Sequence, residues 1–381
     1  MAEYRFDDIA INSTEKKKPV ESDKEHYLGL EHLDSGTFKV SRFGSEVAPI
    51  GDKLIMKKGD VLFGKRRAYQ KKVAIAPFDG IFSAHGMVLR PKEDVIDKNF
   101  FPLFIASDYF LDAAIKISVG SLSPTINWRD LKELKFNLPE LDEQKKLAEV
   151  LWQIVDTMES YKKLLAKTDE MVKAKFVEMF GNDLKENNFK FKKLSEIGNC
   201  KNGINFTDKE NGNCIHCLGV SDFQNFSEIS NCEKLPSISL SEYPSKDYLL
   251  KNNDIVFVRS NGNKELVGRS VLVYPNDVDT TFSGFCIRFR IETDDIIPKF
   301  LLSYLKTDKA RKDLRGRGAN IQNLNQQMLS NLLVPIPPIE QQKSFIDIVQ
   351  KSEESKAAIQ ASLDSLSAVY KKIIAENLGG E

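Results

Sequence analysis

The same long heptad pattern occurs twice in this chain, at an interval of 198 residues. Apolar residues recur at alternating steps of three and four between Leu141 and Gly181, and again between Ile339 and Gly379. Such a row forms one apolar stripe along a helix, and that stripe is buried only against a partner helix. The predicted seam residues are Leu147, Leu151, Ile154, Met158, Leu165 and Val172 in the first copy, and Phe345, Val349, Ile359, Leu363, Leu366 and Tyr370 in the second.

Each copy predicts a helix of about 38 residues, about 57 Å long at about 1.5 Å per residue. The first helix should begin after Pro139, with Asp142 and Glu143 in its first turn, where negative charge suits the helix dipole. Gly181 and Gly379 can end the helices in a left-handed conformation. Because the two copies agree in length and spacing, each helix is the simplest partner for the other. A twofold relation between the two halves of the repeat would then make the packed helices antiparallel.

The repeat extends into the segments before the helices. Residues 120–145 match residues 318–343 at the same offset, and upstream landmarks such as Asp60–Phe63 and Asp254–Phe257 match with gaps. Amphipathic segments near 100–116 and 299–314 predict helices. Short apolar runs between Gly and Asn turn signals predict strands at 53–56, 61–63, 73–76, 87–89 and 134–138, and at 255–258, 267–273, 286–289 and 332–336.

These features favour an α+β fold. Two mixed α/β globular domains are joined by two long helices that form an antiparallel coiled coil, and the whole has a pseudo-twofold repeat. The expected boundaries are 1–138 for the first domain, 139–181 for the first helix, 182–336 for the second domain and 337–381 for the second helix, with a polar linker at 182–188. A rigid spacer of this kind would hold two recognition surfaces at a fixed separation.

Charge is neutral overall but unevenly distributed. The 381 residues include 55 basic and 55 acidic side chains, a balance that by itself argues against nucleic-acid binding. Residues 57–72, however, hold seven basic residues against one acidic residue, and residues 306–317 hold six against two. The first ten residues are charged and no run approaches about 18 apolar residues, so we expect no signal peptide, no membrane span and a cytoplasmic location.

The five cysteines favour reduced thiols over a disulfide framework, because their number is odd and no secretory signal is evident. Cys214 and Cys217 have the spacing of metal ligands, with Cys200, His216 and Cys232 nearby. A zinc ribbon needs a second close pair of ligands, which the sequence lacks. We therefore predict no metal site.

Two matched runs carry a resemblance to a known family. Gly120–Pro139 has the form Gly-x5-Ile-Asn-x3-Leu-x2-Leu-x3-Leu-Pro, its repeat is Gly318–Pro337, and Gln-Lys pairs at Gln144 and Gln342 mark the helix starts. Gly59–Tyr69 is similar to a recurrent target-recognition segment of the same family. On these motifs the chain resembles, over essentially its whole length, the specificity subunit of type I restriction-modification systems.

The resemblance implies two target recognition domains, each reading one half of a split, asymmetric site in double-stranded DNA, with the helices setting the gap. It also implies two modification subunits, which bind S-adenosylmethionine and methylate adenine, and two ATP-driven restriction subunits. This chain would then be non-catalytic and hold no cofactor, leaving S-adenosylmethionine, ATP and Mg²⁺ to its partners. In agreement, the sequence has neither a Gly-x4-Gly-Lys-Ser/Thr phosphate loop nor an Asn/Asp-Pro-Pro-Tyr/Phe methyltransferase motif.

The candidate DNA-binding residues of the first domain lie between two predicted strands. Arginine can bond guanine O6 and N7 with two donors, and glutamine can pair with adenine, whereas lysine more often finds phosphate. A solvated basic loop is the alternative, as is a core or loop role for the histidine. The candidates are Lys65, Arg66, Arg67, Tyr69, Gln70 and His85.

In the second domain the match is looser. An ordinary turn is the alternative for the asparagines, and an ordinary exposed helix face for the basic residues near 311–317. The candidates are Arg259, Asn261, Asn263, Lys264 and Arg269, and, as phosphate anchors, Arg311, Lys312, Arg315 and Arg317.

Three other functions compete with this hypothesis. The chain could be the recognition subunit of a different restriction architecture, a stand-alone enzyme that cuts or methylates DNA, or a coiled-coil scaffold that binds no DNA. The basic loops argue against the scaffold, and the missing catalytic motifs argue against the enzyme.

Overall fold

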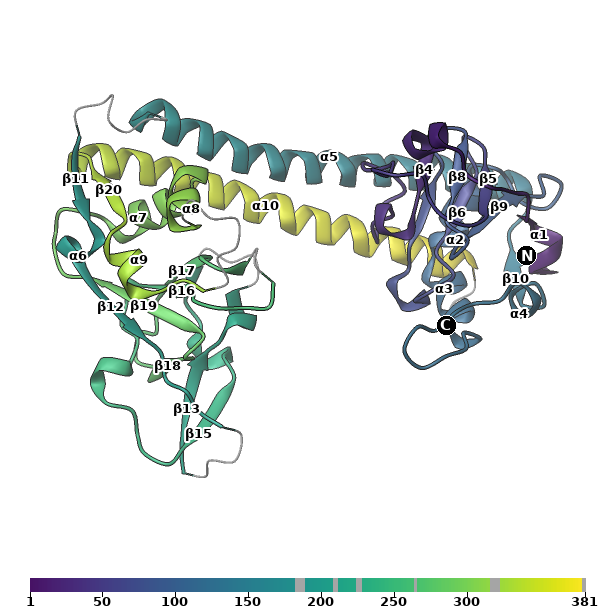
Figure 1. The fold of residues 1–381 in the computed structure, drawn as a ribbon. Helices are drawn as coiled ribbons and strands as arrows, with labels where there is room; N and C mark the ends of the chain where they lie inside the picture. The colour runs from purple at the N-terminus through teal and green to yellow at the C-terminus, as the bar shows by residue number, and fades with distance from the viewer. Residues whose placement is uncertain (182–188, 208–211, 224–227, 264–265, 316–322, 379–381) are drawn as a thin grey trace. The chain divides into compact units, whose positions relative to one another are not determined.

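The computed structural model describes residues 1–181, 189–207, 212–223, 228–263, 266–315 and 323–378 (Figure 1). The chain divides into two units. Unit 1 comprises Met1–Lys163 and Ile359–Glu381, and unit 2 comprises Leu164–Ala358. The predicted linker at 182–188 and the predicted cap Gly379 lie outside the described residues.

The two predicted long helices are present as α5 (Leu141–Phe180) and α10 (Ile339–Leu378), each of 40 residues. In unit 1, Leu151 of α5 packs in the same core as Leu378 of α10. In unit 2, the rings of Phe176 and Phe345 are 5.3 Å apart. The end of one helix therefore meets the beginning of the other in each unit, as an antiparallel pair requires.

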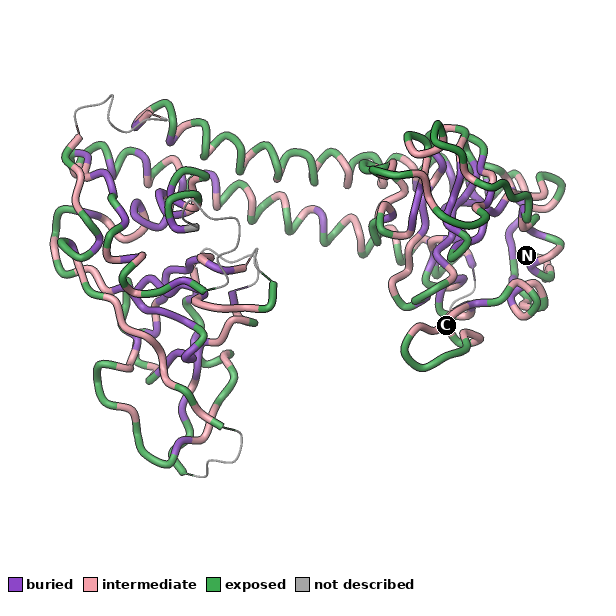
Figure 2. Tube along the Cα trace, in the orientation of Figure 1, coloured by how far each residue is buried: buried purple, intermediate pink, exposed green. Residues whose placement is uncertain are grey.

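The burial of the long helices agrees with the predicted seam. All 12 of its residues are buried or half-buried. Outward positions between them are exposed, and Figure 2 shows this exposed face along both helices. The first helix ends as expected, because Gly181 has a φ of +81° and its amide donates to the carbonyl of Val177 at 2.7 Å.

In unit 1, a two-stranded antiparallel ribbon precedes the long helix, and two four-stranded sheets have the orders β2-β9-β6-β7 and β3-β5-β8-β4. Helices α2 and α3 pack against the first sheet in a core rich in phenylalanine. The elements are β1 (Ala2–Arg5), α1 (Phe6–Ile9), β2 (Ala10–Ser13), β3 (Lys16–Lys17), β4 (Tyr27–Leu28), β5 (Lys53–Met56), β6 (Val61–Phe63), β7 (Val73–Ile75), β8 (Gly80–Phe82), β9 (Met87–Pro91), α2 (Phe100–Ala106), α3 (Asp108–Lys116), α4 (Trp128–Leu131) and β10 (Lys135–Leu138).

Unit 2 has a similar plan, with the ribbon β11-β20, a five-stranded sheet β12-β19-β16-β17-β14 and a three-stranded sheet β15-β13-β18. The parallel pair β13-β18 matches β4-β8, but β15 extends this sheet from β13, whereas β5 and β3 extend the unit 1 sheet from β8. The short strand β14 is an addition to the order seen in unit 1. The elements are β11 (Lys190–Lys193), α6 (Leu194–Ile197), β12 (Gly198–Asn202), β13 (Asn213–Leu218), β14 (Glu228–Ile229), β15 (Ser237–Leu240), β16 (Asp254–Val258), β17 (Ser270–Val273), β18 (Thr280–Phe282), β19 (Cys286–Ile291), α7 (Pro298–Leu305), α8 (Asp308–Arg315), α9 (Gln326–Ser330) and β20 (Leu333–Ile336).

Each predicted strand corresponds to a strand of the structure to within one or two residues, except for one that is shortened by three. The run predicted at 267–273 begins as β17 only at Ser270, because Gly268 has a φ of +80° and turns the chain. The predicted amphipathic segments are the helix pairs α2–α3 and α7–α8. The repeat is thus a repeat of structure as well as of sequence.

The glutamine at each helix start has the same contacts in both units. Gln144 accepts a hydrogen bond from the amide of Asp97 at 2.8 Å and donates to the carbonyls of Val95 and Pro139 at 3.1 and 2.8 Å. Gln342 makes the equivalent three bonds, at 2.9, 2.9 and 2.8 Å. Both side chains are buried, so each ties the first turn of a long helix to its own globular unit.

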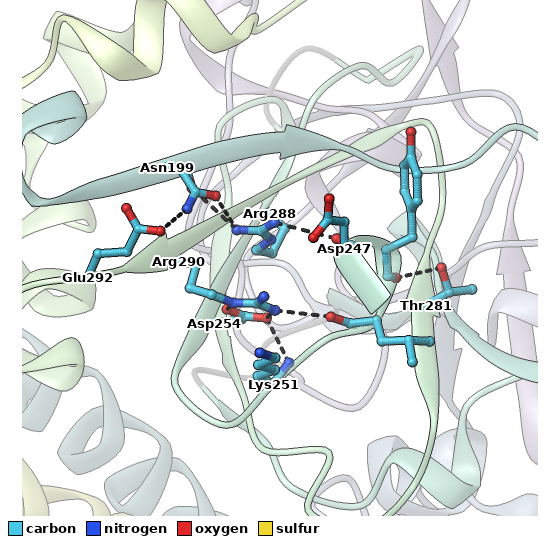
Figure 3. Close-up of polar contacts among 10 residues, drawn as sticks. Asn199, Asp247, Lys251, Asp254, Thr281, Arg288, Arg290 and Glu292 are labelled. Carbon is cyan, nitrogen blue, oxygen red and sulfur yellow. Dashed lines mark hydrogen bonds and ion pairs between the residues drawn. The ribbon is translucent and has the colours of Figure 1, made fainter. Parts of the chain in front are cut away.

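A buried aspartate–arginine pair also recurs. In unit 2, Arg290 of β19 binds both oxygens of Asp254 at 2.8 and 2.7 Å (Figure 3). In unit 1, Arg90 binds Asp60 in the same way, at 2.7 and 2.9 Å. In each unit the carboxylate also accepts from a backbone amide three residues earlier. In each unit the pair fixes the turn at the start of the central strand, β6 in unit 1 and β16 in unit 2.

Unit 2 also has a buried arginine, Arg288, that makes no hydrogen bond to a carboxylate. The strand registers pair Leu62 with Val88 and Val256 with Arg288, so Arg288 occupies the position of Val88. Its guanidinium donates to the side chain of Asn199 at 2.6 Å, and its Nε has no hydrogen-bond partner among the described residues. Burial, and then neighbouring Arg290, lower its pKa. Figure 3 shows Arg288 between Asn199 and Asp247.

Candidate nucleic-acid interface

The first candidate loop joins β6 to β7 in unit 1. It is closed at its base by a hydrogen bond from the amide of Gly64 to the carbonyl of Lys72 at 2.9 Å. Arg67 and Lys71 have left-handed backbones, with φ values of 55° and 48°, on either side of a short 3-10 turn at Ala68–Gln70. This conformation is uncommon for residues other than glycine. As predicted, the loop displays Arg66, Arg67 and Tyr69 to solvent.

A second segment, residues 119–125, holds this loop in place. The amide of Arg67 donates to the carbonyl of Pro124 at 2.8 Å, and the amide of Ile126 donates to the carbonyl of Lys65 at 2.9 Å. The amide of Arg66 donates to the carbonyl of His85 at 3.2 Å. The structure therefore brings together three segments that are distant in sequence, and Lys65, Arg66 and His85 are neighbours.

The charges within this group influence one another. Burial, followed by the charges of Arg66 and Lys65, lowers the pKa of His85, which favours a neutral imidazole. Its Nε2 is 3.4 Å from Nη1 of Arg66. Burial and then Lys16 lower the pKa of the half-buried Lys65. The two exposed arginines are thus the strongest cations that the loop offers to a ligand.

Other residues of the loop have structural partners. Lys71 donates to Asp108 and Asp112 of α3, both at 2.8 Å, so its charge stabilises the packing of the loop on that helix. The side chain of Gln70 is half-buried, and its backbone carbonyl accepts a hydrogen bond from Ser35. The basic cluster seen in the sequence is therefore divided between structural and exposed residues.

Sequence reasoning overlooked two exposed apolar residues beside this loop. Leu122 is 93% exposed and Val119 is 64% exposed, in the segment that braces Arg66 and Arg67. Proteins that bend DNA insert apolar side chains of this kind between base steps. The sequence feature that could have revealed Leu122 is its position as an isolated leucine in a Gly-Ser-Leu-Ser-Pro run, where burial is not expected.

Unit 2 repeats the backbone of this site with different side chains. The amide of Leu324 donates to the carbonyl of Arg259 at 2.8 Å, and Ser260 forms a bridge with Asn323 as Arg66 does with Thr125. Ser260 and Asn261 thus take the places of Arg66 and Arg67. Phe285, which is 61% exposed, takes the place of His85.

The remaining candidates of unit 2 are dispersed. Arg259 is half-buried and donates to the carbonyl of Gly284 at 3.3 Å. Asn261 accepts a hydrogen bond from the amide of Asn263 at 2.8 Å, which is the turn role left open by the sequence. Arg269 and Arg311 are half-buried and Lys312 is exposed. Lys264, Arg317 and the side chain of Arg315 lie outside the described residues.

The cysteines are free thiols in the structure. Cys214 is exposed and Cys217 is buried on β13, where a spacing of three places them on opposite faces of the strand. Across the described ranges, no group of three His, Cys, Asp or Glu residues could hold a metal ion. Within the same ranges, each helix is too short or too polar to cross a membrane.

Similarity to known proteins agrees with this architecture. The chain is 25% identical over 365 residues to the type I restriction enzyme StySPI specificity subunit of Salmonella potsdam, a match that covers 88% of this chain and 75% of the relative. It is 22% identical over 372 residues to the MjaVIII specificity subunit of Methanocaldococcus jannaschii, covering 91% and 84%. The fold is similar to that of the specificity subunit from M. genitalium, with a TM-score of 0.53 at 15% identity over 99% of this chain and 96% of that one.

The same domain is recognised twice along the chain. Residues 5–168 and 186–366 each match the type I restriction modification DNA specificity domain. These two matches fall on the two halves of the repeat, and each includes the candidate loop of its unit. The chain therefore belongs to the type I restriction-modification DNA specificity family and carries two copies of its defining domain.

Proposed function

We propose that this chain is the specificity subunit of a type I restriction-modification complex, and that each unit reads one half of a split DNA site. The observation that supports this most directly is the pair of candidate loops. They have the same backbone anchoring in both units but different side chains at matching positions, namely the exposed Arg66 and Arg67 in one and the half-buried Ser260 and Asn261 in the other. Different side chains on one scaffold suit two different half-sites, and hence an asymmetric site.

The proposal includes partners that carry the chemistry. Two modification subunits would bind S-adenosylmethionine and methylate adenine, and two restriction subunits would use ATP and Mg²⁺. A target base must leave the helical stack before it is methylated, so the reader has to hold the duplex in register while a partner accepts the base. This chain would supply recognition and assembly without catalysis or a cofactor of its own.

The test is to express the chain with methyltransferase and restriction subunits encoded beside it, and to map methylated adenines across the host genome. We expect one bipartite motif with a fixed gap, which disappears when this chain is omitted. Methylation that persists without the partners would instead favour a stand-alone enzyme. A purified chain that shows no preference for the mapped motif over scrambled duplex would contradict the recognition role.

A further inference from the structure

Unit 2 contains a cationic cavity that is separate from the loop at Arg259–Asn263. Its volume is about 450 Å³, and it lies where α5, α8 and the start of β17 meet. Its basic lining residues are Lys173, Arg269, Lys306 and Arg311, and Asp169 is its only carboxylate among the described residues. We propose that this cavity is a binding site for phosphate groups.

The balance of charge in the cavity favours an anion. Asp169 already binds Lys356 of α10, with Oδ1 2.5 Å from Nζ, so this carboxylate is neutralised from outside the cavity lining. Other residues of the chain also interact with three of the basic lining residues, Arg269, Lys306 and Arg311. A bound phosphate would add its contacts to these existing interactions. Arginine and lysine side chains converging on a cavity are the usual recognition elements for phosphate oxygens.

The floor of the cavity leaves room for a ligand. A side chain placed on Gly268 would meet no atom within 4 Å, and the polar Ser270 follows it in the lining. The backbone can therefore be approached closely at this point, as phosphate sites often require.

The equivalent space in unit 1 has a different balance of charge. A cavity of about 350 Å³ lies between α3 and the paired helices, and its lining combines apolar residues such as Leu111, Met158 and Tyr370 with three lysines and two carboxylates, Lys71, Lys162, Lys371, Asp108 and Glu159. Helices α3 and α8 begin at Asp108 and Asp308, so Leu111 occupies the position of Arg311 and Ala106 that of Lys306. A packing requirement shared by both repeats would not explain why these two positions are basic in unit 2 alone.

Basic residues at the unit 1 cavity are already paired with acid. Lys71 and Lys371 bind the two oxygens of Asp108, at 2.8 and 3.1 Å. Lys371 is the repeat counterpart of Lys173, since both lie 198 residues apart in the matched helices. The unit 1 cavity therefore provides a matched control for the unit 2 site.

Lys306 gives the site a pH signature. Burial lowers its pKa to about 8, with smaller opposing effects from Glu353, Glu228 and Asp169, which raise it, and a further lowering by Lys356. A bound phosphate would stabilise the charged amine, so binding should take up protons near pH 8 and weaken as the pH rises above it. The other basic groups that face the cavity beside Lys306 are those of Lys173, Arg269 and Arg311.

The experiment titrates the full-length chain with inorganic tripolyphosphate at low salt, by calorimetry in two buffers of different ionisation enthalpy. We expect saturable binding with proton uptake near pH 8. The double variant Lys173→Gln/Arg311→Gln should bind at least about tenfold more weakly, because it loses two charge-assisted contacts. The control Lys312→Gln/Lys371→Gln removes the same charge from outside the cavity and should stay within about twofold.

Circular dichroism verifies the fold of each variant. Equal weakening of tripolyphosphate binding in both double variants, or no saturable binding to the folded wild-type chain, would overturn the proposal.

A competition with duplex DNA identifies the source of the phosphate. If DNA displaces tripolyphosphate and the cavity variant lowers the salt dependence of DNA binding, the cavity holds a backbone phosphate. If DNA binding is unchanged while tripolyphosphate binding is lost, the ligand is a small phosphate compound. Neither outcome requires the proposed function to be correct.

Discussion

The two arginines after β6 remain our candidates for base reading in unit 1. Arg66 and Arg67 are exposed on a loop anchored at both ends. If they bond guanine edges, Arg66→Ala/Arg67→Ala should lose about 1 to 3 kcal/mol of discrimination at each contacted base pair, in one half-site only. Binding to a panel of single-substituted duplexes measures this, with Arg5→Ala as a control. A uniform loss over all duplexes would assign both residues to phosphate.

Two arginines of β19 should respond in opposite ways to the same substitution. Arg290→Met leaves Asp254, which is 1% exposed, without its cation, and should cost about 3 to 5 kcal/mol of unfolding free energy. Arg288→Met removes a buried cation that has no carboxylate of its own, so stability should be unchanged or rise by about 1 to 4 kcal/mol. Denaturant unfolding of the two variants compares them directly. Equal losses of unfolding free energy in the two variants would mean that the hydrogen bond of Arg288 to Asn199 matters as much as the ion pair of Arg290 with Asp254.

At the scale of elements, the buried glutamines join each long helix to its unit. Gln342→Ala deletes three hydrogen bonds and leaves the amide of Ile297 and two carbonyls without a side-chain partner in a buried site. Unsatisfied buried groups cost about 1 to 3 kcal/mol each, so we expect a loss of about 3 kcal/mol in denaturant unfolding. The neighbouring Gln341 is exposed, and Gln341→Ala should change stability by less than about 0.5 kcal/mol. Similar effects of the two substitutions would refute the structural role of Gln342.

The elements also show what the sequence could and could not predict. The long helices and the central strands have strong apolar periodicity, so their positions were predictable to within a few residues. Strands such as β11 and β12 are rich in Lys and Asn and pair only because a distant partner, β20 or β19, is available. The contact of Arg66 with Thr125 and His85 was unpredictable for the same reason, since it joins three segments by backbone hydrogen bonds.

At the scale of the whole molecule, duplication explains the shared features and divergence explains the specific ones. The glutamine anchors and the aspartate–arginine pairs recur in both units, because each copy must close its own core and attach to its own helix. Exposed loops and the cavities beside the helices differ, because no packing constraint maintains them. We therefore expect the site read by the chain to change when loops are exchanged between relatives, while the two long helices stay alike.

The helices pass from one unit to the other between Lys163 and Leu164 and between Ala358 and Ile359. Inserting seven residues at both points keeps the heptad seam in register and lengthens each helix by about 10.5 Å. At about 3.4 Å per base pair, the gap between half-sites should grow by about three base pairs while both half-site sequences stay the same. Methylation mapping with the partner subunits measures the gap. As a control, inserting seven residues in the exposed loop after Ile50 should leave the gap between half-sites unchanged. An unaltered gap after the helix insertions would exclude the helices as the spacer.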